Sequence, residues 1–255
     1  DPSGGAGIQA DLKTFAAIGV YGTTAITAIT VQNTRGVMAV HPLSADLVVA
    51  QIEAIAADIP LHATKIGMLA TMAIVEGTAA AIADLELPLV VVDPVLMATS
   101  GEPLLDEDGV RALAVELLPR ALVVTPNIPE AEVLSGLSIR TGSDVREAAE
   151  RIHRLGPAVI VTGGHGNGAE VVDVLFDGHR FTEFRAARVD TTHTHGSGCT
   201  FASAVTAHLA LGSSLVEATE RAHVYVGRAI RQAMPLGPGR GPLGHFWNMR
   251  SATDA

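Results

Sequence analysis

Cysteine is nearly absent from this sequence, which holds Cys199 as its one cysteine among 255 residues. A chain with one cysteine cannot form an intrachain disulfide, which predicts a protein of a reducing compartment, the cytoplasm. Long apolar runs are missing as well, because no stretch approaches the roughly 20 apolar residues that a membrane-spanning helix needs. We therefore expect neither a disulfide-stabilised secreted protein nor a membrane partner.

Aromatic residues and positive charge are also scarce. Phe, Trp and Tyr make up 4% of the sequence, so the core must be built from Ala, Val, Leu and Ile. Acidic residues outnumber basic ones by 27 to 17, and the formal net charge is -10. This balance disfavours nucleic acid as a partner, since nucleic acid binds clustered Lys and Arg. A polyanionic ligand such as ATP would depend on local hydrogen-bond donors and metal ions.

Short β-branched runs alternate along the chain with Ala-rich segments of helical periodicity. The pattern predicts helices over 6–18, from 44 onward, and over 71–84, 110–118, 143–155, 198–211 and 214–233. It predicts strands over 21–31, 64–67, 87–93, 121–125 and 158–162, and a hairpin of 171–176 with 180–184. Pro119 is expected to end its helix, and Ser143 to cap the next one. Such alternation predicts an α/β protein with a mostly parallel sheet, helices on both faces and ligands beyond the carboxyl ends of the strands.

The strongest local signal is the segment 194–200, in which Gly196 and Gly198 flank Ser197 just before a helix. Free N–H groups and partial positive charge at a helix N-terminus bind anions, and glycines let a phosphate approach the backbone. Cys199 falls in the first helical turn, where the pKa of a thiol tends to fall, so it is a candidate base or electrostatic partner. An ordinary loop-to-helix turn with a small buried Cys is the plain structural alternative.

Two strand ends carry polar groups suited to a metal-bound phosphate. Asn127 and Glu130 lie three residues apart at a helix start, and their oxygens suit hydrated magnesium, although capping of the helix is the favoured explanation of the pair taken alone. Asp93 ends the most apolar strand, where a buried carboxylate must meet a cation, a metal or hydrogen-bond donors. The glycine-rich segment 2–7 is a weak signal, because it lacks the Lys and Ser/Thr of a Walker A loop.

Together these segments resemble the hydroxymethylpyrimidine/phosphomethylpyrimidine kinases of thiamine biosynthesis, within the ribokinase-like superfamily. The resemblance covers nearly the whole chain, and several long motifs in the family's order are more specific than any one of them. The motifs are DPSGGAGIQADLKTF at 1–15, QNTRG at 32–36, KIGML at 65–69, DPV at 93–95, TPN at 125–127 and HGSGCT at 195–200. The resemblance implies one kinase domain over residues 1–255 with a three-layer αβα ribokinase-like fold. It also implies that ATP and Mg²⁺ are used to phosphorylate the hydroxymethyl arm of an aminopyrimidine, and then the resulting monophosphate.

The resemblance further implies roles for the matching positions. Gly196, Ser197, Gly198 and Cys199 would form the catalytic anion hole. Gln32 would read the edge of the aminopyrimidine, which makes physical sense because a carboxamide offers a donor and an acceptor side by side. The other positions are Met68 and Val95 on the faces of the ring, Ala6 and Asp11 near the substrate, Asn127, Glu130, Thr162 and Gly164 at the nucleotide, and Asp93 with Glu130 at the metal.

Two departures from the family pattern affect these expectations. Thr162 stands where some members carry a Lys that contacts ATP phosphates as a point charge, so this contact is expected to be absent or supplied by another residue. The family also has a strand before the position of Asp1, and we expect the natural protein to extend upstream by that strand. Residues 31–41 are a candidate lid, and a homodimer is expected because members of the family are often dimers.

Other readings of the sequence stay open. A pyridoxal or pyridoxine kinase of the same superfamily acts on a similar flat ring with a hydroxymethyl arm, and Gln32 favours the aminopyrimidine. A Cys–His hydrolase using Cys199 and His195 is disfavoured because no partner that orients the imidazole can be identified. The spacing of His193, His195 and Cys199 matches no standard zinc site. A non-catalytic nucleotide-binding module is disfavoured because the chain retains Cys199, Asn127, Glu130 and Asp93.

Overall fold

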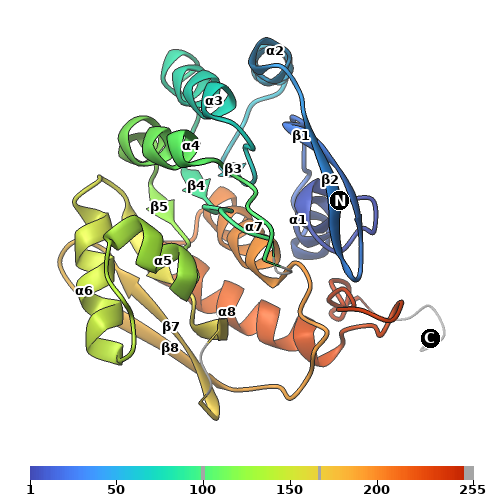
Figure 1. The fold of residues 1–255 in the computed structure, drawn as a ribbon, viewed down its shortest axis with the longest axis vertical. Helices are drawn as coiled ribbons and strands as arrows, with labels where there is room; N and C mark the ends of the chain where they lie inside the picture. Colours follow the sequence, from blue (N-terminus) through green and yellow to red (C-terminus); the bar gives the residue numbers. More distant parts are fainter. Residues whose placement is uncertain (99–100, 166–167, 250–255) are drawn as a thin grey trace.

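A computed structural model of the chain describes residues 1–98, 101–165 and 168–249 (Figure 1). Its centre is a six-stranded sheet in which the strands follow one another in chain order. Strands β3 (Thr64–Ile66), β4 (Val90–Val92), β5 (Val123–Val124) and β6 (Ala158–Val161) run parallel. Strands β7 (Glu170–Phe176) and β8 (Phe181–Ala187) add an antiparallel hairpin at the edge. The predicted mostly parallel sheet is confirmed.

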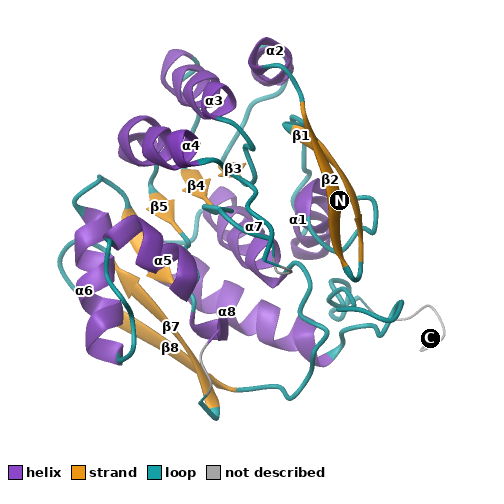
Figure 2. Ribbon diagram, viewed as in Figure 1, coloured by secondary structure: helices purple, strands orange, loops and turns teal. Residues whose placement is uncertain are grey.

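Helices cover both faces of this sheet (Figure 2). One face packs against α2 (Ala45–Ala56), α3 (Met72–Asp84), α4 (Glu107–Ala112), α5 (Ile128–Ser135) and α6 (Gly142–His153). The other packs against α1 (Gly7–Ile18), α7 (Ser197–Ala210) and α8 (Leu215–Arg231). Successive strand residues point to opposite faces, so Val90 and Val92 enter the first core and Val91 the second. This two-sided burial explains why β4 has no polar residue, and it gives the three-layer αβα arrangement.

A separate antiparallel hairpin of β1 (Ala28–Asn33) and β2 (Gly36–Pro42) lies outside the main sheet. The prediction of a strand over 21–31 was wrong for its first part, because regular pairing begins only at Ala28. In the described chain no strand lies beside residues 21–27, and the side chain of Gln51 instead bonds the N–H of Ile26 at 2.9 Å and its carbonyl at 3.0 Å. Extended backbone becomes a strand only where a neighbour offers a ladder of partners.

Two helix boundaries also differ from expectation. α4 is followed by a π-helical turn over Leu113–Leu117 and a 3₁₀ turn over Leu118–Arg120, so Pro119 lies inside the last turn and does not end the helix before it. The N-cap of α6 is Thr141 and not Ser143, because Thr141 and Asp144 form a capping box. In the described part of the chain, no helix is both long enough and apolar enough to cross a membrane.

Candidate functional site

The loops at the carboxyl ends of the parallel strands, together with the β1–β2 hairpin, surround one cleft of about 2160 Å³. This volume exceeds the roughly 300–1,000 Å³ of a typical small-molecule pocket, which leaves room for a nucleotide beside a small acceptor. Part of it runs along residues 20–28 and β3, away from the polar loops. Every residue to which the sequence assigned a role lines this cleft: Ala6, Asp11, Gln32, Met68, Asp93, Val95, Asn127, Glu130, Thr162, Gly164 and residues 196–199.

The segment before α7 has the geometry of an anion-binding turn. Gly196 has φ +80°, and a Cβ there would lie 1.8 Å from the carbonyl oxygen of Gly5, so only glycine fits. The helix begins at Ser197, and the N–H groups of Gly198 and Cys199 fall in its first turn, where no intrahelical acceptor exists. Gly196 is therefore required both by the tight turn and by the close approach of the 2–7 loop, whereas a Cβ on Gly198 would come no nearer than 4.0 Å to Asp93 Oδ1.

The expected lowering of the Cys199 pKa is wrong. Burial raises the pKa of this thiol to about 12, and the charges of Asp93 and Asp11 act in the same direction against the opposing charge of Lys65. A helix N-terminus lowers a thiol pKa only when the thiolate is not also desolvated beside carboxylates. Cys199 is therefore a neutral thiol near pH 7. It can contribute through its position in the anion-binding turn, but not as a preformed thiolate.

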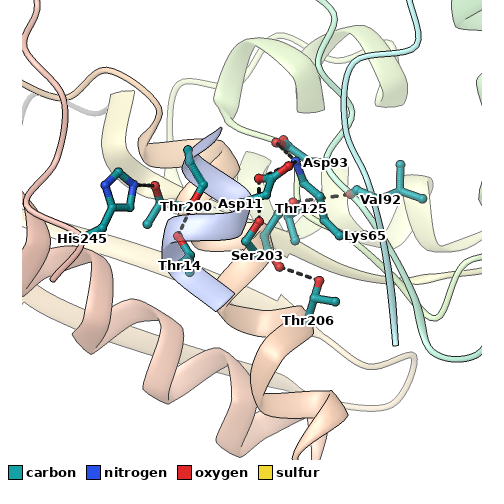
Figure 3. Close-up of polar contacts among 12 residues, drawn as sticks. Asp11, Thr14, Lys65, Val92, Asp93, Thr125, Thr200, Ser203, Thr206 and His245 are labelled. Carbon is teal, nitrogen blue, oxygen red and sulfur yellow. Dashed lines mark hydrogen bonds and ion pairs between the residues drawn. The ribbon is translucent and has the colours of Figure 1, made fainter. Parts of the chain in front are cut away.

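A buried network of charges lies beneath the turn (Figure 3). Lys65 Nζ donates to both carboxylate oxygens of Asp11 at 3.2 Å, and Ser203 Oγ donates to Asp11 Oδ1 at 2.6 Å. Burial alone lowers the pKa of Lys65, but the negative charge of Asp11, together with that of Asp93, outweighs it, and the pKa lies above its ordinary value. Asp11 is thus held by protein groups, and its side chain is not free to be a simple substrate ligand.

Asp93 meets a cation, as its position at the strand end predicted. Its Oδ2 lies 3.8 Å from Lys65 Nζ, which is an ion-pair distance but too long for a hydrogen bond. This oxygen is buried and has no hydrogen-bond partner among the described residues. Burial raises the pKa of Asp93, against the opposing charge of Lys65. The site therefore contains a carboxylate oxygen whose bonding capacity is unused.

Asn127 and Glu130 form the capping box that was the favoured explanation of the pair. Asn127 Oδ1 accepts from the N–H of Glu130 at 3.0 Å, and Glu130 Oε2 accepts from the N–H of Asn127 at 2.9 Å. Glu130 is nevertheless buried in the cleft wall, and burial, followed by the charge of Asp93, raises its pKa to about 8. A cation bound beside these two desolvated carboxyl groups would favour the ionised form of both, so the pair suits a cation site.

Magnesium fits these two side chains. The described residues contain no group of three His, Cys, Asp or Glu that could hold a metal ion by themselves. A phosphate-bound magnesium ion needs only one or two carboxylates, because phosphate oxygens and waters fill its other positions. The unused oxygen of Asp93 supplies the observation in favour of this fit.

The hairpin side of the cleft carries the expected ring-reading residues. A β-bulge between Val31 and Gln32 interrupts the register of β1, and the Gln32 carboxamide oxygen accepts from Thr30 Oγ1 at 3.1 Å. That bond orients the carboxamide and leaves its NH₂ group available. The side chains of Met68 and Val95 are half-buried at the cleft surface, as ring-packing residues would be.

His195 has the orienting partner that could not be identified from the sequence, but the pair does not make a hydrolase. Its Nε2 lies 2.8 Å from Asp1 Oδ2, and its ring fills the space where a side chain at Gly5 would lie. No hydrogen bond between His195 and Cys199 occurs in the described residues, and the thiol pKa is raised, whereas a nucleophile requires it lowered. His195 instead ties the 2–7 loop to the anion-binding turn.

Sequence reasoning missed the roles of Lys65 and Ser203. In the sequence, Lys65 is recognisable only as part of the motif KIGML at 65–69. A lone cation in a short apolar strand nevertheless requires a negatively charged partner. Asp11 is 54 residues away and Ser203 lies on α7, so nothing local identified the network.

The chain that forms this cleft is similar to known proteins in both sequence and structure. A family model described as "Phosphomethylpyrimidine kinase" matches residues 1–244. A Rhizobium meliloti protein named hydroxymethylpyrimidine/phosphomethylpyrimidine kinase is 49% identical over 253 residues, covering 96% of this chain and 94% of that protein. The Geobacter sulfurreducens thiamine biosynthesis bifunctional protein ThiED is 47% identical over 247 residues, and the match spans 96% of this chain but 50% of that protein. Among solved structures, an ADP complex of Bacillus subtilis pyridoxal kinase superposes with a TM-score of 0.89 at 41% identity, covering 96% of this chain and 93% of that one.

Proposed function

This chain belongs to the phosphomethylpyrimidine kinase family, and from that premise we propose that it carries out two phosphorylations. The terminal phosphoryl group of ATP moves first to 4-amino-5-hydroxymethyl-2-methylpyrimidine and then to its monophosphate, giving the diphosphate used in thiamine biosynthesis. One observation carries the proposal: the anion-binding turn, the carboxylates Asp93 and Glu130, and the hairpin residue Gln32 line one cleft.

The chemistry follows from positioning and charge neutralisation. Phosphoryl transfer passes through a loose transition state with charge on the equatorial oxygens, so the protein has little covalent chemistry to do. The N–H groups at residues 196–199 would stabilise that charge. Cys199, a thiol near pH 7, would hydrogen-bond the acceptor hydroxyl and hold it in line with the phosphoryl group.

The remaining residues divide between the two ligands. Asn127, Thr162 and Gly164 would lie against the nucleotide, and Asp93 and Glu130 would hold magnesium, whose charge neutralises the phosphates. The N–H of Thr162 bonds the carbonyl of Pro126 at 2.9 Å, which supports a joint nucleotide role for the loops after β5 and β6.

At the other end of the cleft, Gln32 would read the pyrimidine edge, with Met68 and Val95 on the ring faces. Ala6 would lie near the substrate, and Asp11 would act through its bond to Lys65. The reading by Gln32 is supported by its carboxamide, whose oxygen is oriented by Thr30 while the NH₂ group has no hydrogen-bond partner among the described residues.

Pyridoxal kinase activity is the second candidate. The Bacillus subtilis structure with a TM-score of 0.89 is named a pyridoxal kinase. The ring of pyridoxal also bears a hydroxymethyl arm. The deciding experiment is a coupled ADP-release assay of the full-length protein with magnesium-ATP and either acceptor, followed by mass spectrometry of the product. Fast turnover of the pyrimidine to a diphosphate supports the proposal. Turnover with pyridoxal alone makes the second candidate correct. The absence of ADP release with either acceptor contradicts both candidates and favours a non-catalytic module.

Three further proposals concern the state of the protein. A single domain over residues 1–255 is supported by one main sheet with a core on each face. A homodimer rests on the family, and light scattering of the purified protein tests it. A cytoplasmic location is supported by the single cysteine, which excludes an intrachain disulfide, and fractionation of cells tests it.

A further inference from the structure

A pair of buried ionisable side chains, Asp173 on β7 and His223 on α8, lies outside the chemistry described so far. Their side chains are 6% and 8% exposed, and His223 Nδ1 lies 2.6 Å from Asp173 Oδ2. Buried charged groups are retained where each has a partner, and here each side chain is the partner of the other. Both residues are in the lining of the cleft, and the second oxygen of Asp173 contacts one of the loops that surround it.

That contact is with the loop of residues 162–164, named here the 162–164 loop. The N–H of Gly163 donates to Asp173 Oδ1 at 2.8 Å. A Cβ on Gly163 would lie 2.2 Å from the carbonyl oxygen of Val172, so the loop is pressed directly against β7. The carboxylate of Asp173 thus accepts a hydrogen bond from the backbone of the loop on the side of the sheet. The imidazole of His223, bonded to the other oxygen, holds the carboxylate in that orientation.

The outer side of the same loop is held independently. Arg188 donates to the carbonyl of Gly164 at 2.9 Å and to that of Gly163 at 3.4 Å. At its start, the loop is bonded to the loop that follows β5, because the N–H of Thr162 donates to the carbonyl of Pro126. A loop with Gly-Gly at its centre has many alternative conformations, so such fixed contacts select one of them.

We infer that Asp173, held by His223, is a positioning residue that fixes the 162–164 loop in the conformation that binds ATP. The inference rests on the proposed function, in which Thr162 and Gly164 lie against the nucleotide. Both residues are in the lining of the cleft, and the contact through which they act is the bond from Asp173 to the backbone N–H of Gly163. A loop that binds phosphate through its backbone requires that backbone to be fixed before the ligand arrives.

The test compares Asp173→Ala with Asp173→Asn. The Ala variant leaves the N–H of Gly163 without its acceptor, whereas the carboxamide oxygen of Asn can still accept from it. We expect Asp173→Ala to raise the KM for magnesium-ATP about tenfold, the scale of an unpaired buried donor, with the KM for the aminopyrimidine changed less than about twofold. Asp173→Asn should recover most of the affinity for ATP, which a merely structural role for the side chain would not predict.

Asp177→Ala is the matched control. Asp177 also accepts backbone N–H bonds, from His179 and Arg180, but in the exposed turn of the same β7–β8 hairpin, away from the cleft. It should leave both KM values unchanged. If Asp173→Ala does not fold, His223→Gln provides the test. This variant must raise the KM for magnesium-ATP without an equal rise in the KM for the aminopyrimidine.

Equal changes in both KM values, or an unchanged KM for ATP in these variants, would overturn the inference. ADP binding measured by calorimetry keeps this result separate from the proposed function. If the wild-type protein phosphorylates neither acceptor, the proposed function fails, while a selective loss of ADP binding in Asp173→Ala still supports the positioning role.

Discussion

Replacing Lys65 with Met isolates the energetic role of the buried charge network. The side chains of Lys65, Asp11 and Asp93 are 5%, 12% and 6% exposed, so removal of the cation leaves two desolvated carboxylates without a counter-charge. Removing one partner of a buried ion pair destabilises a protein by about 3–5 kcal/mol. We expect a loss of that size at pH 8, because Met fills the volume of Lys and the change is mainly in charge.

The sign of the pH dependence follows from the pKa shifts. The pKa of Lys65 is raised in the folded state, so its contribution is fully present below the unfolded value of about 10.5 and is lost only above it. In the variant, the raised pKa of Asp93 rises further, and the folded state then holds a proton that the unfolded chain releases above about pH 4. The destabilisation of the variant should therefore be smaller at pH 5 than at pH 8.

Urea unfolding of both proteins at the two pH values measures the effect. Arg151→Met is the matched control, because Arg151 pairs with Glu147 on the surface of α6, where the side chains are 41% and 53% exposed. An exposed pair of this kind contributes about 0.5 kcal/mol or less. The double variant Lys65→Met with Asp11→Asn should be less destabilised than the two single changes added together.

A loss no larger than that of the Arg151 control would refute the reasoning, as would a loss that does not depend on pH. Either result would mean that water or a rearranged Ser203 hydroxyl solvates the carboxylates by hydrogen bonds, which the geometry does not show.

The remaining predictions concern the cleft. Cys199→Ala should lower kcat at least tenfold while calorimetric ADP binding survives, with Cys199→Ser retaining more activity because its hydroxyl can still donate; unchanged turnover in the Ala variant would remove Cys199 from the mechanism. Gln32→Leu should raise the KM for the aminopyrimidine about tenfold or more, as expected for polar groups of the ring left unpaired, and an unaltered KM would count against its role in recognition. Gly196→Ala should destabilise the protein in thermal unfolding by about 1–2 kcal/mol or more, because φ +80° disfavours a side chain and the Cβ meets Gly5, and a stable, active variant would contradict the tight turn. Because a bond to Asp173 raises the pKa of His223, its contribution is fully present below the unfolded value of about 6.5 and fades as pH rises through the folded pKa. Wild type should therefore exceed His223→Gln in unfolding free energy by more at pH 6 than at pH 9, and a gap that widens with pH would disprove the ion pair.

Much of the candidate site was predictable because its signals are local. The glycines around Ser197, the helix that follows them and the polar residues at the strand ends can be recognised within a few positions of the chain. The unbroken apolar character of β4 predicted burial on two faces, and both cores contain its residues. Strand ends at one edge of a parallel sheet must meet, so the sequence predicts Asp93 and Asn127 in one cleft.

The prediction failed where a property depends on what surrounds a residue. Position in a helical turn suggested a lowered pKa for Cys199, but the turn lies over a desolvated group of carboxylates, and burial has the larger effect. Residues 21–27 have the composition of a strand, but strand formation depends on a neighbouring backbone that composition does not specify.

The sequence alone determined the order of most of the elements, with β2 as an exception, and also the anion-binding turn and the family resemblance, since these are recorded in contiguous residues. Only the tertiary structure decided that Lys65 meets Asp11, that Asp93 keeps an unused oxygen and that Asp173 reaches the 162–164 loop. These contacts join residues far apart in the chain, and the protonation states that follow depend on desolvation, which exists only once the chain has folded.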